Sequence, residues 1–254
     1  MFEELVGKRV LITGASRGIG AAIARCLGRY GVAVAVHYHA SEAAAREVAD
    51  DIVGTGGQAV LVRGDVSLGP DAVAVVERAA EQLGGLDVLI NNAGDMLGRV
   101  RLEDMDDAQY DRVMDLNARS VVAASRAALS IFRRQGGGNI IHTSSIAARN
   151  GGGAGAGLYA SAKGFVSTLT RNMAKELAAD GIRVNAVAPG TIATDFHGRY
   201  SSDAQLEAAR ATIPMGRLGT ADDCVGAYLF LATEALSAYV TGQVIEVNGG
   251  QLTP

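Results

Sequence analysis

Residues 13–20 read Thr13-Gly14-Ala15-Ser16-Arg17-Gly18-Ile19-Gly20, and this stretch decides the fold. It follows a short apolar run and precedes a segment with apolar residues at helical spacing. The first glycine can turn the chain sharply, and the other two let backbone approach a pyrophosphate and let the helix pack close to a sheet. The free N–H groups and the positive end of the helix dipole would then face the phosphates. The alternative is a strand–helix turn that binds nothing, but the position after a first strand favours a dinucleotide site.

Strand-like and helix-like segments alternate along the whole chain. The strand-like runs, short and rich in valine and isoleucine, are residues 9–13, 32–37, 58–63, 87–91, 139–143, 183–188 and 243–247. The helix-like segments are residues 19–30, 41–54, 72–83, 107–134, 159–179 and 221–232. Most runs lack polar alternation, which is typical of strands covered on both faces. We therefore predict one α/β domain over residues 1–254, a doubly wound, seven-stranded, mostly parallel sheet with helices on both faces.

Composition excludes several classes of protein. Of the 254 residues 48% are hydrophobic, and the net charge is −4 without any basic run, so neither disorder nor nucleic-acid binding is expected. No apolar stretch approaches the ~18 residues that span a bilayer, and the acidic N-terminus does not resemble a signal peptide. Cys26 and Cys224 lie in apolar helical patterns, which predicts buried thiols in a reducing cytoplasm. His37 and His39 alternate at a strand end, but we predict no metal site.

The end of the second strand indicates which dinucleotide is bound. NAD enzymes usually place an acid there to accept from the ribose 2′-OH, whereas this chain has Val36-His37-Tyr38-His39-Ala40-Ser41. Arg17, with His39 and Ser41 as further donors, could instead bind a 2′-phosphate. This pattern favours NADP(H) over NAD(H), although Arg17 could also be a solvated loop residue.

Tyr159 and Lys163 are four positions apart in a helical pattern, which places them on one face of a helix. A free tyrosine, with a pKa near ~10, transfers protons poorly at neutral pH. A nearby ammonium group stabilises the phenolate and lowers that pKa, which suits acid–base catalysis. The pair is therefore a candidate catalytic centre.

The chain resembles the short-chain dehydrogenases/reductases over its whole length. The resemblance rests on Gly14-x3-Gly18-x-Gly20, Asn91-Asn92-Ala93-Gly94, Asn117, Ser145, Tyr159-x3-Lys163, Pro189-Gly190, Tyr239-Val240-Thr241-Gly242-Gln243 and Asn248-Gly249-Gly250. It implies a Rossmann fold and a catalytic set in which Tyr159 protonates the carbonyl oxygen during reduction. In that set Lys163 lowers the tyrosine pKa and binds the nicotinamide ribose, Ser145 holds the substrate oxygen, and Asn117 holds a water that links Lys163 to solvent. Ser144, the neighbouring hydroxyl, is the alternative to Ser145.

The resemblance also implies a cofactor site. Its members, with the glycine loop and the second strand end included, are Gly14, Ser16, Arg17, Gly18, Ile19, Gly20, His39, Ser41, Asp65, Val66, Asn91, Ala93, Gly94, Tyr159, Lys163, Pro189, Gly190, Ile192 and Thr194. Asp65 and Val66 would border the adenine, and the last four residues would cover the nicotinamide. Residues 191–215 are expected to form a mobile segment over the substrate, and the glycine-rich residues 151–157 to form a loop beside the catalytic tyrosine.

Within the family the chain looks most similar to bacterial 3-oxoacyl-[acyl-carrier-protein] reductases. A basic residue that often helps to receive the acidic carrier is replaced by Asp180, although Arg133, Arg134, Arg199 and Arg210 could converge and restore a docking patch. We therefore expect an NADPH-dependent oxidoreductase acting on small carbonyl or alcohol substrates, with the acyl-carrier-protein thioester as a further candidate. A sugar or polyol dehydrogenase is the alternative, and a catalytically silent dinucleotide-binding regulator is a more remote one.

The helical segments 107–134 and 159–179 carry more apolar residues than one stripe on a sheet requires. Those noted are Val113, Leu116, Val121, Val122, Leu129, Ile131, Phe165, Val166, Leu169, Met173 and Leu177. A large exposed patch and an isologous interface are therefore expected, and the resemblance suggests a homotetramer.

Overall fold

The seven strands form one sheet in the order β3-β2-β1-β4-β5-β6-β7, and every neighbouring pair is parallel. The computed structural model describes residues 2–253. The strands are β1 Arg9–Ile12, β2 Ala33–Tyr38, β3 Gln58–Arg63, β4 Val88–Asn91, β5 Gly138–Thr143, β6 Ile182–Pro189 and β7 Val244–Val247. The predicted doubly wound sheet is thus confirmed, and it is entirely rather than mostly parallel. The strand order reverses between β1 and β4, where a crevice opens at the carboxyl ends of the strands.

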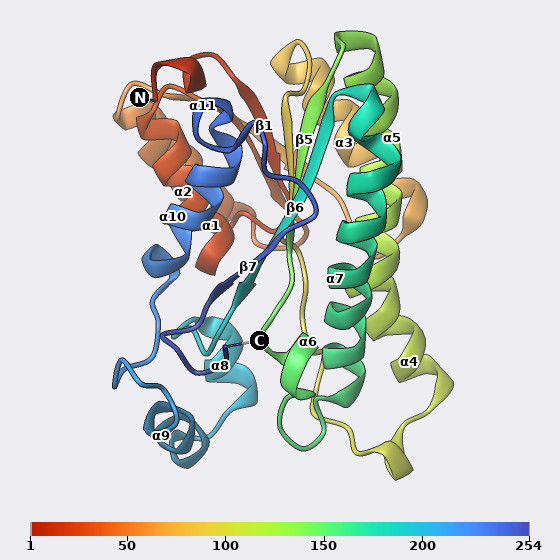
Figure 1. Ribbon diagram of the computed structural model, residues 1–254, viewed down its shortest axis with the longest axis vertical. Coiled ribbons are helices and arrows are strands. Elements are labelled where there is room, and N and C mark those ends of the chain that lie inside the picture. Colours follow the sequence, from red (N-terminus) through yellow and green to blue (C-terminus); the bar gives the residue numbers. More distant parts are fainter. Residues whose placement is uncertain (1, 254) are drawn as a thin grey trace.

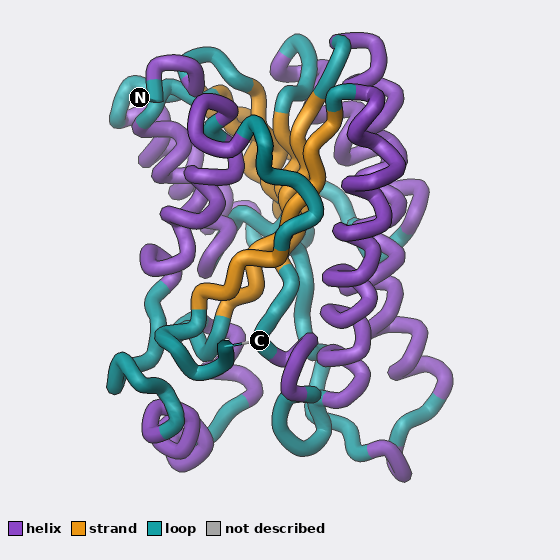
Figure 2. The backbone as a smooth tube through the Cα atoms, in the orientation of Figure 1, coloured by secondary structure: helices purple, strands orange, loops and turns teal. Residues whose placement is uncertain are grey.

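Two layers of helices cover the sheet (Figures 1 and 2). One layer contains α1 Gly18–Arg29, α2 Glu42–Gly54, α10 Ala221–Ala232 and the short α11 Glu234–Ser237. The other contains α3 Gly69–Leu83, α4 Asp107–Met114, α5 Ser120–Gln135 and α7 Gly157–Leu177. Three short helices lie at the carboxyl ends of the strands: α6 Ala147–Asn150, α8 Asp195–Tyr200 and α9 Asp203–Ala211. The amino ends of α1 and α7 lie at the same edge, so both candidate sites share it.

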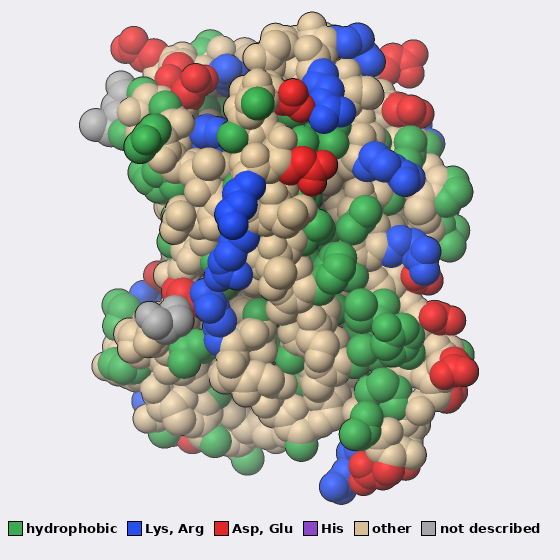
Figure 3. Space-filling view, turned by 45° about the vertical axis from the view of Figure 1, so that its right-hand side comes forward, with side chains coloured by type: hydrophobic (Ala, Val, Ile, Leu, Met, Phe, Trp, Pro, Cys, Tyr) green, Lys and Arg blue, Asp and Glu red, His purple; other side chains and the backbone are tan. Residues whose placement is uncertain are grey.

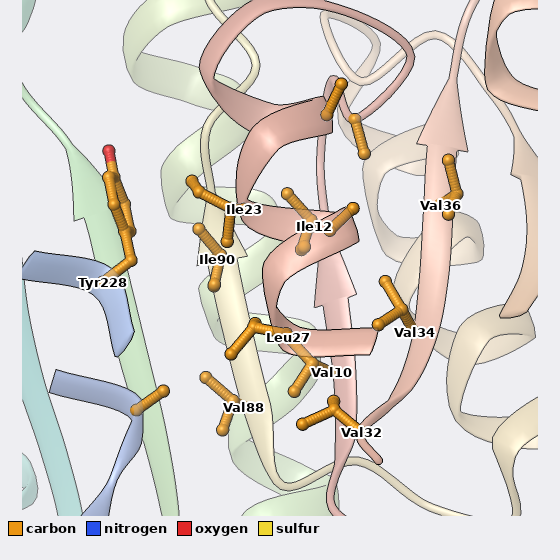
Figure 4. Packing of buried hydrophobic residues seen from close by; sticks show 14 of the residues in the cluster. Val10, Ile12, Ile23, Leu27, Val32, Val34, Val36, Val88, Ile90 and Tyr228 are labelled. Carbon is orange, nitrogen blue, oxygen red and sulfur yellow. The ribbon is translucent and has the colours of Figure 1, made fainter. Parts of the chain in front are cut away.

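Alternate residues of each strand enter opposite cores. Val10 and Ile12 of β1 pack with α1 and α10 in one core, whereas Leu11 between them packs with α3 and α5 in the other. Figure 4 shows the first core, where Ile23 and Leu27 of α1 meet β1 and β4. Because side chains alternate along a strand, a strand covered on both faces reads as an unbroken apolar run.

The long helical segment predicted over residues 107–134 is interrupted. Residues Asp115–Arg119 form a π-helical turn between α4 and α5. Asn117 lies in that turn, and its side-chain Nδ2 donates to the Val113 carbonyl at 2.9 Å. A π turn inserts one residue into a helix, often at a functional site, and the periodicity of apolar residues does not reveal it. Residues 191–215, expected to form a mobile segment over the substrate, contain α8 and α9; their mobility stays a prediction.

The expected apolar patch on α5 and α7 is smaller than predicted. Val113, Val121, Ile131, Val166, Met173 and Leu177 are buried inside this chain, while Leu116, Leu129 and Leu169 pack partly against its core. Val122 and Phe165 are the two exposed members, at 39% and 42%. Figure 3 shows hydrophobic side chains gathered between scattered charges on the face of this helical layer. The homotetramer therefore stays a prediction that rests on fewer residues than expected.

Cys26 and Cys224 are both buried, as predicted. Within residues 2–253, no helix has the length and apolar character needed to cross a membrane. The cytoplasmic location stays a prediction.

Candidate active site

A cleft of about 780 Å³ opens at the carboxyl ends of the strands, beneath α8 and α9. Of the predicted site residues, all except Gly20, Asn91 and Asn117 line it. The glycine loop and the end of β2 form one part of its wall, and Ser145, Tyr159 and Lys163 form another. The two predicted sites are therefore parts of one continuous cleft.

The glycine loop has the features of a phosphate cradle. Gly20 packs so closely against the Gly14 carbonyl and the Asn92 side chain that a Cβ would lie only 2.6 Å from Asn92 Nδ2. Helix α1 begins here without an acidic residue in its first turn and without a side-chain cap. Its first N–H groups therefore keep their capacity to bind an anion, reinforced by the helix dipole. These residues fit a dinucleotide pyrophosphate.

The buried side chain of His37 holds the glycine loop in place through a hydrogen bond. The Gly14 N–H donates to His37 Nδ1 at 2.9 Å, and His37 Nε2 lies 3.2 Å from the Gly64 carbonyl. Since Nδ1 accepts, the proton sits on Nε2 and is donated to Gly64. Burial lowers the pKa of His37 to about 4, so the ring is neutral and holds this pattern at physiological pH. His37 therefore has a structural role, because it holds the glycine loop against the end of β3.

The His37 contact predicts acid sensitivity. Because the folded-state pKa, about 4, lies below the unfolded value of 6.5, His37 favours the folded state above pH 6.5, and this contribution is lost as pH falls towards 4. Lowering the pH from 7 to 5 should cost about 2 kcal/mol of unfolding free energy through this residue. His37→Asn keeps an acceptor for Gly14 but does not titrate, so urea unfolding at the two pH values should give a smaller difference. An unchanged difference would show that the loss arises elsewhere.

The Asn91-Asn92-Ala93-Gly94 segment ties β4 to β1. The N–H groups of Asn92 and Ala93 donate to Thr13 Oγ1 at 2.9 and 3.0 Å, and Asn92 Nδ2 donates to the Thr13 carbonyl at 2.9 Å. Asn91 points away from the cleft, and its Nδ2 donates to Ser125 Oγ at 3.1 Å. Asn91 therefore braces the sheet, while Asn92, which the sequence analysis gave no role, lines the cleft.

Ser145, Tyr159 and Lys163 converge in the cleft. The Ser145 hydroxyl lies beside Tyr159, where it acts to lower the pKa of the phenol, and Lys163 Nζ lies 5.7 Å from the centre of the tyrosine ring. Lys163 Nζ also donates to the Thr143 carbonyl at 2.9 Å, which fixes the ammonium beside the end of β5. Ser144 points elsewhere: its hydroxyl contacts the Lys163 carbonyl at 3.1 Å and Ser167 Oγ at 2.7 Å in the protein interior. The geometry thus favours Ser145 over Ser144.

The pKa of Tyr159 departs from the expectation. Burial is the main cause that raises it to about 12, the Ser145 hydroxyl acts to lower it, and the charge of Asp95 adds a smaller increase. Lys163 was expected to depress this pKa, but burial lowers the lysine's own pKa to about 8. The chain's own residues therefore keep Tyr159 protonated at neutral pH, because desolvation of the phenolate is the largest influence on its pKa.

Asn117 lies behind the cleft, beside Lys163. Its Oδ1 accepts from the Asp95 N–H at 3.1 Å, and its Nδ2 donates to the Asp95 carbonyl at 2.7 Å. A Cβ at Gly94 would lie 2.8 Å from Asn117 Oδ1 and 2.9 Å from Lys163 Nζ. The missing side chain of Gly94 thus leaves space for the side chains of Asn117 and Lys163. The π-helical turn Asp115–Arg119 places Asn117 next to this space.

Helix α8 closes over the catalytic end. The Phe196 ring packs against the Tyr159 ring with centres 5.5 Å apart. Arg199 Nη1 pairs with Asp95 Oδ2 at 2.7 Å, and Arg17 Nη1 lies 3.8 Å from Asp195 Oδ2. These contacts join α8 to both ends of the cleft.

Comparison with known proteins is consistent over the whole chain. A family model described as enoyl-(acyl-carrier-protein) reductase matches residues 14–251. A 3-oxoacyl-[acyl-carrier-protein] reductase of Synechocystis sp. is 37% identical over 252 residues, which cover 98% of each chain. This chain is a short-chain dehydrogenase/reductase.

Two similar proteins of known structure differ in the nucleotide with which they are associated. The NADH-dependent reductase A1-R′, responsible for alginate metabolism, is 42% identical, with a TM-score of 0.91 and coverage of 99% of this chain and 100% of that one. A short-chain dehydrogenase from Burkholderia cenocepacia in complex with NADP is 34% identical, with a TM-score of 0.90 and coverage of 97% and 98%. The family is therefore established as an oxidoreductase family, and its members differ in the nucleotide they use.

In this short-chain dehydrogenase/reductase the nucleotide end of the cleft is rich in hydrogen-bond donors. A guanidinium nitrogen of Arg17 contacts Ser41 Oγ, and His39 Nε2 lies 3.9 Å from Asp65 Oδ2. Tyr38 occupies the strand end, and its residue is only 7% exposed. Arg17, His39 and Ser41 therefore lie on one wall of the cleft, as the sequence suggested.

The four arginines considered for carrier docking do not form one patch within this chain. Arg133 lies in the last turn of α5, and its Nε pairs at 2.8 Å with Oδ2 of Asp180, which comes just before β6. Arg133, Arg134 and Asp180 thus lie at the amino ends of β5 and β6, at the sheet edge opposite the cleft. Arg199 and Arg210 lie in α8 and α9, at the cleft edge. Arg133, which could have replaced the missing basic residue at position 180, is instead paired with the carboxylate of Asp180.

Proposed function

We propose that this short-chain dehydrogenase/reductase is an NADPH-dependent reductase of small carbonyl compounds. The observation that carries the proposal is the convergence of Ser145, Tyr159 and Lys163 in a cleft whose other end holds the glycine loop and Arg17. The bound nicotinamide would supply the hydride. The proposed cofactor residues are those of the glycine loop and the strand ends, together with Pro189, Gly190, Ile192 and Thr194.

The chain's residues suit proton donation to a carbonyl oxygen. Tyr159, protonated at neutral pH because its pKa is about 12, would donate the phenolic proton, and the Ser145 hydroxyl would donate a hydrogen bond to the same oxygen. Lys163, held by the Thr143 carbonyl at 2.9 Å, would stabilise the phenolate left behind, and Asn117 would connect Lys163 to solvent. Phe196 against the tyrosine ring would keep bulk water from the reacting atoms.

We further infer a preference for NADPH over NADH. The end of β2 carries no carboxylate before Glu42, and Arg17, His39 and Ser41 offer donors for a 2′-phosphate. Arg17→Ala should therefore weaken NADPH binding by roughly 3- to 10-fold, as expected when an exposed charge-assisted contact is lost. NADH binding should hardly change, so the difference in affinity between NADPH and NADH becomes smaller. Fluorescence titration with both nucleotides checks this, and equal affinities in the parent protein would contradict the preference.

The substrate is proposed to be a small molecule rather than a carrier-bound thioester. The support is the absence, within residues 2–253, of a cationic patch that joins Arg133 and Arg134 to the cleft edge. A sugar or polyol dehydrogenase is the second candidate; its support concerns the substrate class only, because proteins similar to this chain include a reductase responsible for alginate metabolism. A silent nucleotide-binding regulator is disfavoured by the convergence of Ser145, Tyr159 and Lys163 in the cleft.

A screen that follows NADPH absorbance tests the proposal. It compares an acetoacetyl group on acyl-carrier protein with the same group on a small thiol, and adds simple ketones and aldoses with NADP and NAD. A carrier preference that collapses with salt would mean electrostatic docking and would overturn the small-substrate assignment.

A further inference from the structure

Arg99 is a half-buried cation in the wall of the cleft for which the proposed chemistry has no use. It follows β4 in the loop that leads to α4. The other cations of the cleft have partners or a role: Arg199 pairs with Asp95, Arg17 lies near Asp195, and Lys163 belongs to the catalytic set. Within residues 2–253, no carboxylate oxygen lies within salt-bridge distance of Arg99. A partly desolvated guanidinium without a counter-ion is costly unless an anion joins it.

The guanidinium of Arg99 is held in place by neutral groups. Its Nε donates to the Tyr200 carbonyl at 2.6 Å, and its Nη1 donates to the Ala154 carbonyl at 3.0 Å. A guanidinium has five N–H donors, so three of them have no acceptor among the described residues. The side chain is thus oriented by two backbone carbonyls and still has donors for a ligand.

The glycine-rich loop is shaped around this arginine. Gly155 has a φ of +74°, and a Cβ there would lie 2.9 Å from Arg99 Cβ. The Val100 N–H donates to the Gly155 carbonyl at 3.1 Å, so the loop lies directly against the arginine's backbone. Gly155, in the glycine-rich loop of residues 151–157, therefore makes room for Arg99.

The positive charge of Arg99 influences a titratable group that lines the cleft. His197, on the facing helix α8, has its pKa lowered by burial and, next, by the charge of Arg99. Tyr200, whose carbonyl binds Arg99, packs against Phe196, which in turn packs against Tyr159. Arg99 is therefore connected to the catalytic tyrosine through two aromatic rings and lies at the substrate end rather than at the nucleotide end.

We propose that Arg99 binds the carboxylate of the substrate, so that the compound reduced by this enzyme is a small oxo acid. The assignment rests on the proposed function and adds the substrate class. A carboxylate matches the planar fork of donors on a guanidinium. A monoanion is favoured over a dianionic phosphate, because Asp95 lines the same cleft.

Two pairs of probes test the assignment: 4-oxopentanoate with its methyl ester, and 5-oxohexanoate with its methyl ester. Each ester keeps the ketone and removes the charge, and two chain lengths allow for the unknown reach between the carbonyl and the arginine. The parent enzyme should reduce at least one acid with a higher kcat/KM than its ester. Calorimetric titration of the enzyme–NADPH complex with the same compounds gives a second readout that does not need turnover.

Three variants separate recognition from folding. Arg99→Gln should lower kcat/KM for the preferred acid by roughly 10- to 100-fold, the scale of a lost charge-assisted hydrogen bond, and leave that for the ester nearly unchanged. Arg99→Lys keeps the charge without the fork and should retain part of the preference. Arg101→Gln is the matched control, because Arg101 is 74% exposed, pairs with Glu103 and lies outside the cleft.

The outcomes distinguish the two proposals. An equal loss for acid and ester in Arg99→Gln, or an ester reduced and bound as well as its acid by the parent, overturns the role of Arg99 while leaving the reductase intact. If the parent turns over no carbonyl compound with either nucleotide, the proposed function fails, and calorimetry then decides whether the carboxylate site exists. Binding of neither acid would refute the site.

Discussion

Replacing Tyr159 by Phe should lower turnover by at least ~10²-fold, the usual scale of a lost general acid, while NADPH still binds. The substitution removes one oxygen and keeps the ring, so the packing against Phe196 at 5.5 Å should persist. Ser145 and Lys163 would remain, but in the proposed mechanism Ser145 only hydrogen-bonds the substrate oxygen and Lys163 stabilises the phenolate. Neither replaces the phenol as the proton donor. The measurement is single-turnover reduction of whichever ketone the screen identifies.

The matched control is Tyr110→Phe. Tyr110 is 50% exposed and lies outside the cleft, so loss of its hydroxyl should leave turnover as in the parent. Turnover of Tyr159→Phe close to that of the control would show that the tyrosine is not the acid, and the mechanism would fail with it.

The sheet could be predicted well from the sequence, because each strand is marked by the composition of its own few residues. The strands that are covered on both faces are rich in apolar residues, as in Val10, Leu11 and Ile12 of β1. The π turn at Asn117 could not be predicted in the same way, because it shifts a hydrogen-bond register without changing the spacing of apolar residues enough to be seen. The family resemblance marked Asn117, but only the structure shows why the helix is interrupted there.

The site residues that belong to short sequence motifs could be predicted. Those that contact one another only across long stretches of sequence could not. Arg99 belongs to no motif, and its two acceptors lie 55 and 101 positions away, at Ala154 and Tyr200. Phe196 against Tyr159 is a similar contact across 37 positions (196 − 159). The pKa of Tyr159 follows the same rule: the spacing to Lys163 suggested a lowered value, whereas burial by distant segments raises it.

Gly20→Ala should weaken NADPH binding by roughly 10- to 100-fold and lower the unfolding free energy by about 1–3 kcal/mol, the range for overpacking at a close contact. The Cβ would meet the Gly14 carbonyl oxygen at less than any ordinary contact distance, and would lie 2.6 Å from Asn92 Nδ2 and 3.1 Å from Ala15 Cα. Two of these three neighbours are backbone atoms, so rotation of a side chain cannot relieve the overlap.

The loop must therefore move, and it is held from two sides. The Gly14 N–H donates to His37 Nδ1 at 2.9 Å, and Asn92 Nδ2 donates to the Thr13 and Gly14 carbonyls at 2.9 and 3.1 Å. A shift large enough to admit the Cβ stretches these contacts and turns the first N–H groups of α1 away from the phosphates. Both stability and nucleotide affinity should fall, because one set of hydrogen bonds serves both.

Gly226→Ala provides the matched control for this prediction. Gly226 lies inside helix α10, and a Cβ there would meet nothing within 4 Å. The same substitution should then stabilise the protein by about 0.5–1 kcal/mol, the cost of an interior helical glycine relative to alanine, and leave NADPH binding unchanged. Urea unfolding and NADPH fluorescence titration measure both quantities. If Gly20→Ala binds NADPH as tightly as Gly226→Ala does, the close packing of the third glycine does not shape the phosphate site, and the placement of the pyrophosphate at the start of α1 is wrong.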